Sequence, residues 1–299
     1  MPKVHTVLGD LTEYLDYKES YLRAGSFKVY RLFAFKMREF LSVHNLSHLE
    51  TKKVTPAQCE QYKRFILKKH SDPTTRNKEI GQMKCFFYQF TKPGWERYRV
   101  SPAANVELVP KQDSEMHEPY STEQVAEIFG AILAKRDYWL LLYIYFIHYT
   151  FARPGREVRF LKVGDLKPRA LLIRPENSKT RRTKTPTIPK PLEELIGYLS
   201  VKNYPLDWYI FGTDGEPGPI ACGQNMYYYR HKEILKALNL VGRYTLYGWK
   251  HTGNIRAIQL GVADRELQLQ NGFKEHRTLE IYLRRLSAYY STEIYDKFV

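Results

Sequence analysis

Apolar residues recur at intervals of three and four positions through most of the first ninety residues. This spacing puts hydrophobic side chains on one face of an α-helix, and it predicts helices over residues 11–24, 27–43, 56–69 and 74–90. Thr55-Pro56 and Asp72-Pro73 place a capping residue and a proline where helices usually start. We therefore expect an all-α domain over residues 1–110.

The periodicity stops over residues 101–119, where prolines and polar residues predict an extended connection. We place the linker itself at 111–119 and a second domain at 120–299. This domain opens with Ser121 and Thr122, either of which is suited to cap a helix. Glu123 or Gln124 would then complete a capping box.

The second domain mixes helical spacing with short β-like runs. Helices are predicted over 123–150, over 192–199 and from 223 to the end of the chain. Residues 170–175 and 184–188 read as two strands joined by a basic turn, and 208–211 read as a further strand. The predicted fold class is mainly α with a small antiparallel β-sheet (α+β).

Charge then points to the partner. The 299 residues carry a net charge of +15, with 24 Tyr, 15 Phe and 4 Trp among the basic residues. Such an excess favours a polyanion such as nucleic acid over a merely basic protein. A membrane partner is disfavoured, because no single helix concentrates the positive face and no apolar run reaches about 18 residues.

Targeting signals and cysteines add little. The N-terminus is charged and lacks the apolar core of a signal peptide, so we expect a cytoplasmic, nucleoid-associated protein. The three widely spaced cysteines suggest a reducing compartment, and they form neither a disulfide framework nor a metal site.

Basic side chains on the predicted helices and on the basic turn are candidates for gripping DNA, although a charged run is more often a solvated face. The candidates are Arg31, Lys36, Lys63, Arg64, Lys78 and Lys84 in the first domain, and Arg181, Arg182 and His251 in the second.

Three further side chains are candidates for chemistry. Arg153 follows an apolar helix, and a guanidinium binds a phosphate through two parallel hydrogen bonds, unless it serves only to pair with Glu157 or Asp165. Lys179 lies in the basic turn and is suited either to protonate a leaving oxygen or simply to contact the DNA backbone. Tyr282 lies on an amphipathic helix, where a tyrosine is either part of the core or a nucleophile.

Together these motifs resemble the tyrosine recombinase (phage integrase) family over essentially the whole chain. The resemblance rests on the order of the motifs. Thr150-Phe-Ala-Arg153 comes first, with Glu157, Leu161 and Asp165, and Lys179 follows in the predicted hairpin of residues 170–188. Tyr247-Gly-Trp-Lys250-His251-Thr252 comes next, and Asn271-Gly272-Phe273 with Thr278 and Tyr282 comes last. It implies a SAM-like helical core-binding domain followed by a catalytic domain with a C-terminal tail helix.

The resemblance also implies an activity. The Tyr282 hydroxyl would attack a DNA phosphodiester, form a 3′-phosphotyrosine bond and free a 5′ hydroxyl, and religation would need no metal, ATP or other cofactor. Arg153, Lys179, Lys250 and Tyr247 would act in catalysis. Phe273 holds the position of a late histidine or tryptophan, with His276 three residues on as a substitute.

Three departures from the family pattern leave two readings open. Glu157 lies four positions after Arg153 where the family has three, so Arg156 is a second candidate for the first arginine. Lys250 replaces the second arginine and keeps the charge without the bidentate fork. Phe273 replaces the late histidine. The chain is therefore either an active divergent recombinase or a degenerate relative that binds DNA as an architectural protein.

The implied partners follow from the same resemblance. They are double-stranded DNA at recombination sites, a homotetramer linked by the C-terminal tail, and accessory DNA-bending or directionality proteins. A phage or mobile element is the expected setting. An RNA-binding protein is a weaker alternative, because it rests only on charge and aromatic content.

Overall fold

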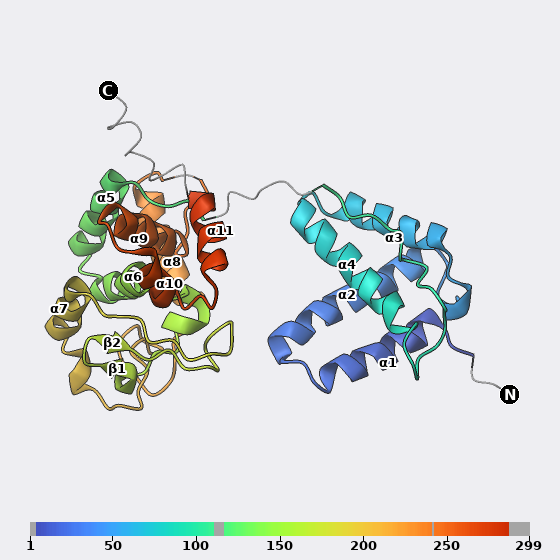
Figure 1. Cartoon of the computed structure of the whole chain (residues 1–299), viewed down its shortest axis with the longest axis horizontal. Helices are drawn as coiled ribbons and strands as arrows, with labels where there is room; N and C mark the ends of the chain where they lie inside the picture. Colours follow the sequence, from blue (N-terminus) through green and yellow to red (C-terminus); the bar gives the residue numbers. More distant parts are fainter. Residues whose placement is uncertain (1–3, 111–116, 241, 287–299) are drawn as a thin grey trace, which may run out of the picture. The chain divides into compact units, whose positions relative to one another are not determined.

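The computed structural model describes residues 4–110, 117–240 and 242–286. The chain divides into two compact units, residues 1–114 and 115–299 (Figure 1). Each unit is described by itself.

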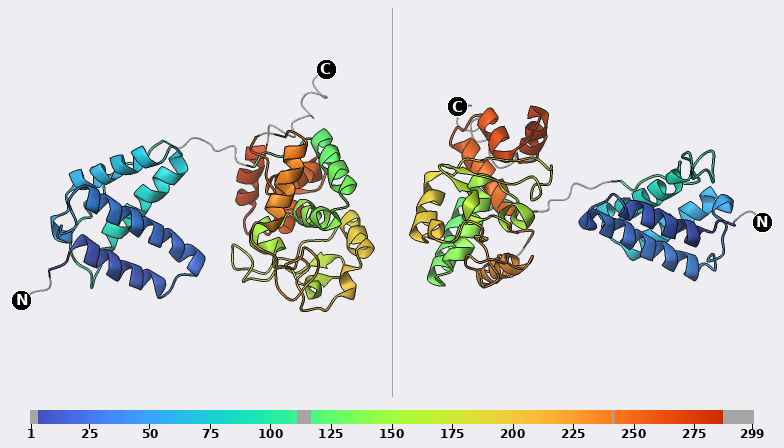
Figure 2. Two further views of the ribbon diagram at one scale, coloured as in Figure 1. Left: turned by 180° about the vertical axis from the view of Figure 1, so that it is seen from behind. Right: turned by 90° about the horizontal axis from the view of Figure 1, so that it is seen from below.

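The first unit packs four helices around an aromatic core (Figures 1 and 2). The Phe86 ring lies edge-on to Tyr14 at 5.3 Å and to Phe90 at 5.0 Å, so one side chain joins two helices and the turn after α4. The regular elements of this unit are α1 (Val7–Glu19), α2 (Ala24–Val43), the 3-10 turn η1 (Thr51–Lys53), α3 (Pro56–Lys69) and α4 (Pro73–Gln89).

Side-chain capping explains where α1, α3 and α4 begin. Thr55 forms a capping box with Gln58, and the Asp72 side chain accepts a hydrogen bond from the Thr75 backbone, which confirms both predicted starts. The predicted bounds of the first helix are wrong. It begins earlier, at Val7, because the Thr6 side chain caps it, and it ends at Glu19 before the chain turns into α2.

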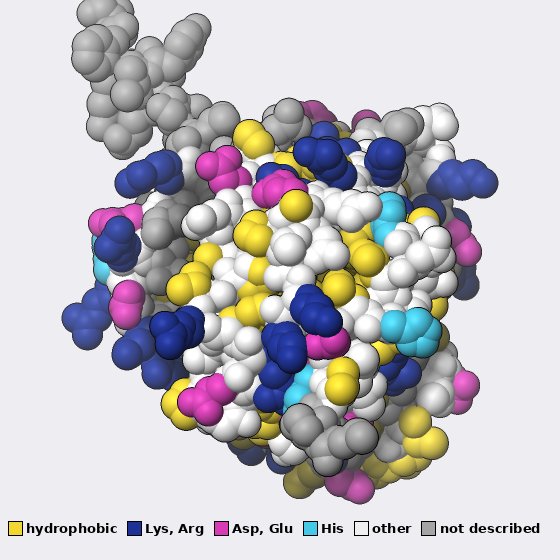
Figure 3. Space-filling model, turned by 90° about the vertical axis from the view of Figure 1, so that its right-hand side faces the viewer, with side chains coloured by type: hydrophobic (Ala, Val, Ile, Leu, Met, Phe, Trp, Pro, Cys, Tyr) yellow, Lys and Arg dark blue, Asp and Glu magenta, His cyan; other side chains and the backbone are white. Residues whose placement is uncertain are grey.

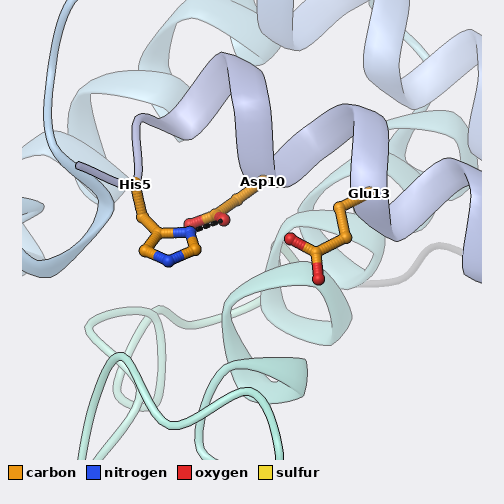
Figure 4. Close-up of side chains that lie close together, drawn as sticks. All are labelled: His5, Asp10 and Glu13. Carbon is orange, nitrogen blue, oxygen red and sulfur yellow. Dashed lines mark hydrogen bonds and ion pairs between the residues drawn. The ribbon is translucent and has the colours of Figure 1, made fainter. Parts of the chain in front are cut away.

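A polar cluster lies at the start of α1 (Figure 4). The His5 ring nitrogen Nδ1 is 3.0 Å from Asp10 Oδ1, and Glu13 follows one turn on. Arg97 Nη2 lies 2.8 Å from His5 Nδ1, 3.5 Å from Asp10 and 3.9 Å from Glu13. The Arg97 guanidinium therefore supplies the positive charge that a metal ion would bring to these carboxylates. Its contacts also connect the segment after α4 to α1.

The second unit is built around the apolar helix α6. Eight of its 13 residues are buried, and α5, α7, α8 and α9 pack around it (Figures 1 and 2). Within the described residues, no helix combines the length and the apolar composition that crossing a membrane requires. The helices and helical turns are α5 (Thr122–Ala134), α6 (Tyr138–Thr150), η2 (Pro154–Val158), η3 (Val163–Asp165), α7 (Lys190–Tyr198), η4 (Val201–Asn203), α8 (Met226–Ala237), α9 (Gly248–Gln259), α10 (Asp264–Asn271) and α11 (His276–Leu286).

Helix α5 confirms the predicted capping box. The Ser121 side chain accepts from the Gln124 backbone, while the Gln124 side chain accepts from the Ser121 backbone. The helical prediction beyond residue 223 is confirmed for α8 to α11. It is wrong between α8 and α9, where the described residues of 238–247 are not helical. The expected docking tail covers residues 283–299. Residues 283–286 are the end of α11, and residues 287–299 lie outside the described residues.

The β-structure is smaller than the sequence predicts. β1 (Leu166–Lys167) pairs antiparallel with β2 (Ala170–Leu171), while the segments 170–175 and 184–188 meet only through the single bridges Ala170–Thr187 and Ile173–Lys184. Pro186 interrupts the second segment and cannot donate a hydrogen bond to the ladder, and Pro175 ends the first segment. The strand expected at 208–211 is wrong, because it pairs only through isolated bridges of Tyr209 and Gly212. The predicted class, mainly α with a small antiparallel sheet, is confirmed.

Candidate active site

A π-helical turn after α6 positions Arg153. Helix α6 ends at Phe151 in a left-handed conformation, and the extended Arg153 leads into η2, which is a π-helix. The Arg153 backbone N–H donates to Glu157 Oε2 at 2.9 Å, and its Nη1 donates to Oε1 at 2.5 Å. A π-helical turn holds one residue more than an α-helical turn. The extra residue between Arg153 and Glu157 is therefore absorbed locally, and the pair still meets.

Glu157 also binds a second cation. Its Oε2 lies 3.1 Å from Lys184 Nζ, and the two side chains are only 1% and 3% exposed. Burial opposes the charge on Glu157, but Lys184 and Arg153 outweigh it and lower the pKa of the carboxyl group. Burial also lowers the pKa of Lys184, although Glu157 acts in the other direction. One carboxylate thus holds two cations at the site.

Lys250 is fully buried and joins three elements. From α9, its ammonium donates to the Phe151 carbonyl at the end of α6 at 2.6 Å and to Asn271 Oδ1 of α10 at 2.7 Å. A cation suits the negative end of a helix dipole. Burial first, then the positive charges of Lys184 and Arg153, lowers the pKa of Lys250 well below its usual value. An ammonium carries three donors, so these two bonds leave one unaccounted for within the described residues.

The Asn271-Gly272 turn closes the site from the side of α10. Gly272 has a left-handed φ of +68°, and a Cβ there would lie 2.6 Å from Lys184 Cε. Gln270 links the same turn to the hairpin, accepting from the Thr187 backbone N–H at 2.9 Å and donating to the Tyr149 carbonyl at 2.9 Å. Gly272, the glycine of the last sequence motif, thus packs against the buried Lys184.

Tyr282 of α11 points its hydroxyl at His251 of α9. The phenol oxygen lies 2.6 Å from His251 Nδ1, and the Phe273 ring lies 5.7 Å from the Tyr282 ring. Burial, followed by Tyr247, raises the pKa of Tyr282 well above its usual value, although Arg153 acts against this. Burial, Lys250 and His117 lower the pKa of His251 to about 4. Both side chains are therefore neutral near pH 7.

His117 joins this group from the segment before α5. Its ring lies 5.0 Å from the Tyr247 ring, and the Tyr247 ring lies 5.1 Å from the His251 ring. His117 Nδ1 is 2.7 Å from the Thr245 hydroxyl. Because His117 falls in the stretch that the sequence assigns to the linker, no local pattern marks it. Only the fold places it beside His251.

The structure brings together Arg153, Tyr247, Lys250, His251, Phe273 and Tyr282, and it adds Glu157, Lys184, Asn271 and His117. Lys179 and Arg156 are exposed and lie outside this cluster of contacts. His276 is also exposed, and its ring lies 3.2 Å from Glu280 and 3.7 Å from Asp264. No local pattern in the sequence separates Lys184 from the other basic residues between 179 and 184.

The candidate DNA-gripping side chains differ in what they contact. Lys36 pairs with Glu79 at 2.6 Å, and Lys84 donates to the carbonyls of Ala104 and Val106 at 2.9 and 2.6 Å. These two lysines stabilise the first unit internally. Lys63 lies 3.7 Å from Glu60. The exposed candidates are Arg31, Arg64, Lys78, Arg181 and Arg182. On the face in Figure 3, Lys and Arg side chains lie scattered among hydrophobic and uncharged ones.

Comparison with solved structures places the fold. The chain is similar to a lambda integrase dimer bound to a COC′ core site, with a TM-score of 0.75 and 14% identity over 93% of this chain and 77% of that one. It is similar to the Tn1549 transposon integrase in complex with transposon right end DNA, with a TM-score of 0.72 and 13% identity over 94% and 99% of the two chains. The chain is also similar to a lambda integrase tetramer bound to a Holliday junction, with a TM-score of 0.73 and 13% identity over 93% of this chain and 78% of that one.

No family model matches the sequence, and no curated protein matches it. The structural similarity extends over both units of the chain. The fold is that of the DNA-bound integrases, and the tyrosine recombinase fold expected from the motifs is confirmed. At identities of 13–14% the similarity shows the fold alone.

Proposed function

We propose that this chain is a site-specific tyrosine recombinase that cuts and rejoins DNA through a 3′-phosphotyrosine intermediate. The observation that carries the proposal is the position of Tyr282. Its hydroxyl is hydrogen-bonded to His251, and His251 follows directly on Lys250, whose pKa responds to both Lys184 and Arg153. A phenol and several cations gathered in one buried site suit the attack of a nucleophile on a phosphodiester.

Each side chain has a role that its environment supports. Glu157 raises the pKa of Arg153 despite the opposing effect of burial, so the guanidinium stays charged and can bind phosphate oxygens. The third N–H of Lys250 is suited to the same phosphate. The exposed Lys179 would swing in on its loop as the acid for the leaving oxygen. Arg153 lies in the cluster and Arg156 does not, which favours Arg153 as the first arginine.

The alternative is a binding protein without strand cleavage. The feature that favours it is the enclosure of Lys250, whose ammonium already bonds Phe151 and Asn271. If those bonds persist with DNA present, the phosphate loses one of its cations. The two functions differ in one product, a covalent protein–DNA bond.

The adduct is sought without knowing the recognition sequence. The full chain is incubated with a pool of nicked duplexes that carry randomised half-sites and a 5′ label on the cleaved strand. Attachment of Tyr282 to a 3′ phosphate leaves the 5′-labelled fragment on the protein after denaturation, whereas a 3′ label leaves with the free 5′ hydroxyl. Sequencing the captured strands then gives the site.

Two variants make this experiment decisive. Tyr282→Phe removes only the nucleophilic oxygen and should abolish the adduct while leaving DNA binding. Tyr198→Phe, at an exposed tyrosine of α7, should leave the adduct unchanged. DNA binding by the wild-type protein without any adduct in the pool would decide for the architectural protein.

The biological setting is part of the same proposal. We infer that the protein acts on recombination sites in double-stranded DNA of a phage or mobile element, in the nucleoid, as a tetramer joined through the C-terminal tail of residues 283–299. Accessory proteins would set the direction of the reaction. The tetrameric lambda integrase on a Holliday junction supports this assembly by analogy of fold.

A further inference from the structure

We propose that His251 is the base that accepts the proton of the Tyr282 hydroxyl, an assignment that rests on the proposed function. The sequence motif places His251 beside Lys250 and suggests only a DNA contact. The structure instead directs its ring nitrogen at the reacting oxygen, at 2.6 Å.

The geometry is that of a nucleophile and its base. General bases act at hydrogen-bond distance, about 2.6–3.2 Å, from the proton that they remove. The ring centroids of His251 and Tyr282 lie 5.4 Å apart with an interplanar angle of 32°, and the Phe273 ring lies 5.7 Å from the phenol ring. The contact joins α9 to α11, so both partners are held by helices and not by loops.

Protonation states fix the direction of the hydrogen bond. With the pKa of His251 lowered to about 4, the ring is a neutral imidazole with one donor and one acceptor nitrogen near pH 7. Because the pKa of Tyr282 is raised, its phenol keeps its proton. The hydroxyl therefore donates to Nδ1, and the imidazole proton resides on Nε2.

The groups that face His251 set when it can act. Lys250 on its own helix and His117 from the segment before α5 both oppose a charge on the ring, and Tyr247 lies against it. A phosphodiester that enters beside Lys250 brings a negative charge that favours the imidazolium. His251 would thus become a better base when DNA is bound. The Tyr247 hydroxyl cannot substitute, because a phenol is a much weaker base than an imidazole.

The proposed step balances. The Tyr282 oxygen forms a bond to phosphorus while the bond between phosphorus and the 5′ oxygen breaks, and the phenol proton moves to His251 Nδ1. The 5′ oxygen takes a proton from an acid, proposed above as Lys179. In religation the 5′ hydroxyl oxygen attacks phosphorus and gives its proton back to Lys179, while the imidazolium returns its proton to the departing Tyr282 oxygen.

His251→Asn is the decisive variant. The asparagine Oδ1 takes the place of Nδ1 and keeps the hydrogen bond from Tyr282, but an amide does not accept the proton. Single-turnover cleavage of the nicked substrate should slow by about 100- to 10,000-fold, the usual contribution of a general base. The wild-type rate should level off above the pKa of His251, whereas the variant rate should keep rising about tenfold per pH unit, because it depends on free phenolate.

His251→Ala adds a second readout. Exogenous imidazole should restore part of its cleavage rate and should not speed up His251→Asn, whose side chain fills the space. His48→Ala, at an exposed histidine of the first unit, is the matched control and should cleave like the wild type.

The outcomes separate the inference from the function on which it rests. If His251→Asn cleaves within about threefold of the wild-type rate with the same pH profile, His251 only positions the tyrosine and the inference is wrong. If the wild-type protein binds DNA but forms no adduct, the proposed function itself fails.

Discussion

At the scale of single residues, the site depends on one carboxylate among cations. Glu157 neutralises part of the charge of Arg153 and Lys184. Among the residues that the structure describes, no carboxylate pairs with Lys250, and its two hydrogen bonds go to neutral oxygens. Positive charge in a buried site is costly unless it is paired. The lowered pKa of Lys250 follows from this cost, and under the proposed function a bound phosphate would supply the anionic partner.

Replacing Glu157 tests this balance. Glu157→Gln keeps the shape but leaves Lys184 buried without its carboxylate, and it should lower the free energy of unfolding by about 3–5 kcal/mol. Adding Lys184→Met should recover part of that loss, because the unpaired cation is then gone. Urea unfolding followed by tryptophan fluorescence measures the free energy of unfolding of the single and the double variant. Glu194→Gln, at an exposed pair on α7, should leave the unfolding curve unchanged. A double variant that is no more stable than Glu157→Gln would show that the pairing with Lys184 contributes nothing.

The residues that the sequence missed are defined by long-range contacts. The basic hairpin was evident from composition, but nothing local shows that Lys184 turns inward to Glu157, 27 positions away, while Lys179 stays exposed. The bond between His251 and Tyr282 spans 31 positions. Spacing located both motifs, and packing alone decided which atoms meet.

At the scale of elements, the close packing of α9 on α6 aligns the site. Gly253 faces the backbone of α6, and a Cβ there would lie 1.9 Å from the His148 carbonyl oxygen. This approach lets Lys250, one turn earlier, reach the carbonyl of Phe151. Capping residues predicted the starts of α3, α4 and α5 correctly, because caps are local. The π-turn at η2 shows in the sequence only as an extra residue between Arg153 and Glu157. The long-range partner of Glu157 is Lys184, 27 positions away, which no local pattern reveals.

Gly253→Ala should therefore disturb the site from within the helix interface. A backbone carbonyl cannot move aside as a side-chain end can, so overpacking should lower the unfolding free energy by about 1–3 kcal/mol or more. Gly130→Ala is the matched control, because Gly130 lies at an exposed position of α5 and a Cβ there would meet nothing within 4 Å. Helix propensity alone should then stabilise that variant by up to about 1 kcal/mol. Thermal melts of the two proteins should shift in opposite directions. Equal shifts would mean that α6 and α9 have room to separate.

At the scale of the whole molecule, the order of the motifs along the sequence predicted the fold. The overall sequence identity to the proteins that share this fold is too low to predict it. Lambda integrase shares only 14% of aligned residues with this chain, yet the fold matches over 93% of it. The motifs that include Arg153, Gly272 and Tyr282 follow one another along the sequence in the order of the family pattern. The remaining positions need only preserve an apolar pattern, and many sequences do so.

The net charge of +15 does not by itself tell which cations meet DNA. Lys36 and Lys84 are engaged inside the first unit, whereas Arg181 and Arg182 project from the hairpin. Only cations that neutralise phosphates release counterions, and each contributes about 0.9 to the slope of log affinity against log salt. The salt dependence of binding therefore counts the phosphate contacts that the net charge overstates.

Arg181→Ala should reduce that slope by about 1 and weaken binding to all duplexes alike, because a phosphate contact carries no sequence information. Fluorescence anisotropy with a labelled duplex across a series of salt concentrations gives the slope directly. Lys190→Ala, an exposed lysine at the start of α7, serves as the control of equal charge change and should leave the slope as it is. If both variants lower the slope equally, the effect comes from net charge, and the hairpin does not lie on the DNA backbone.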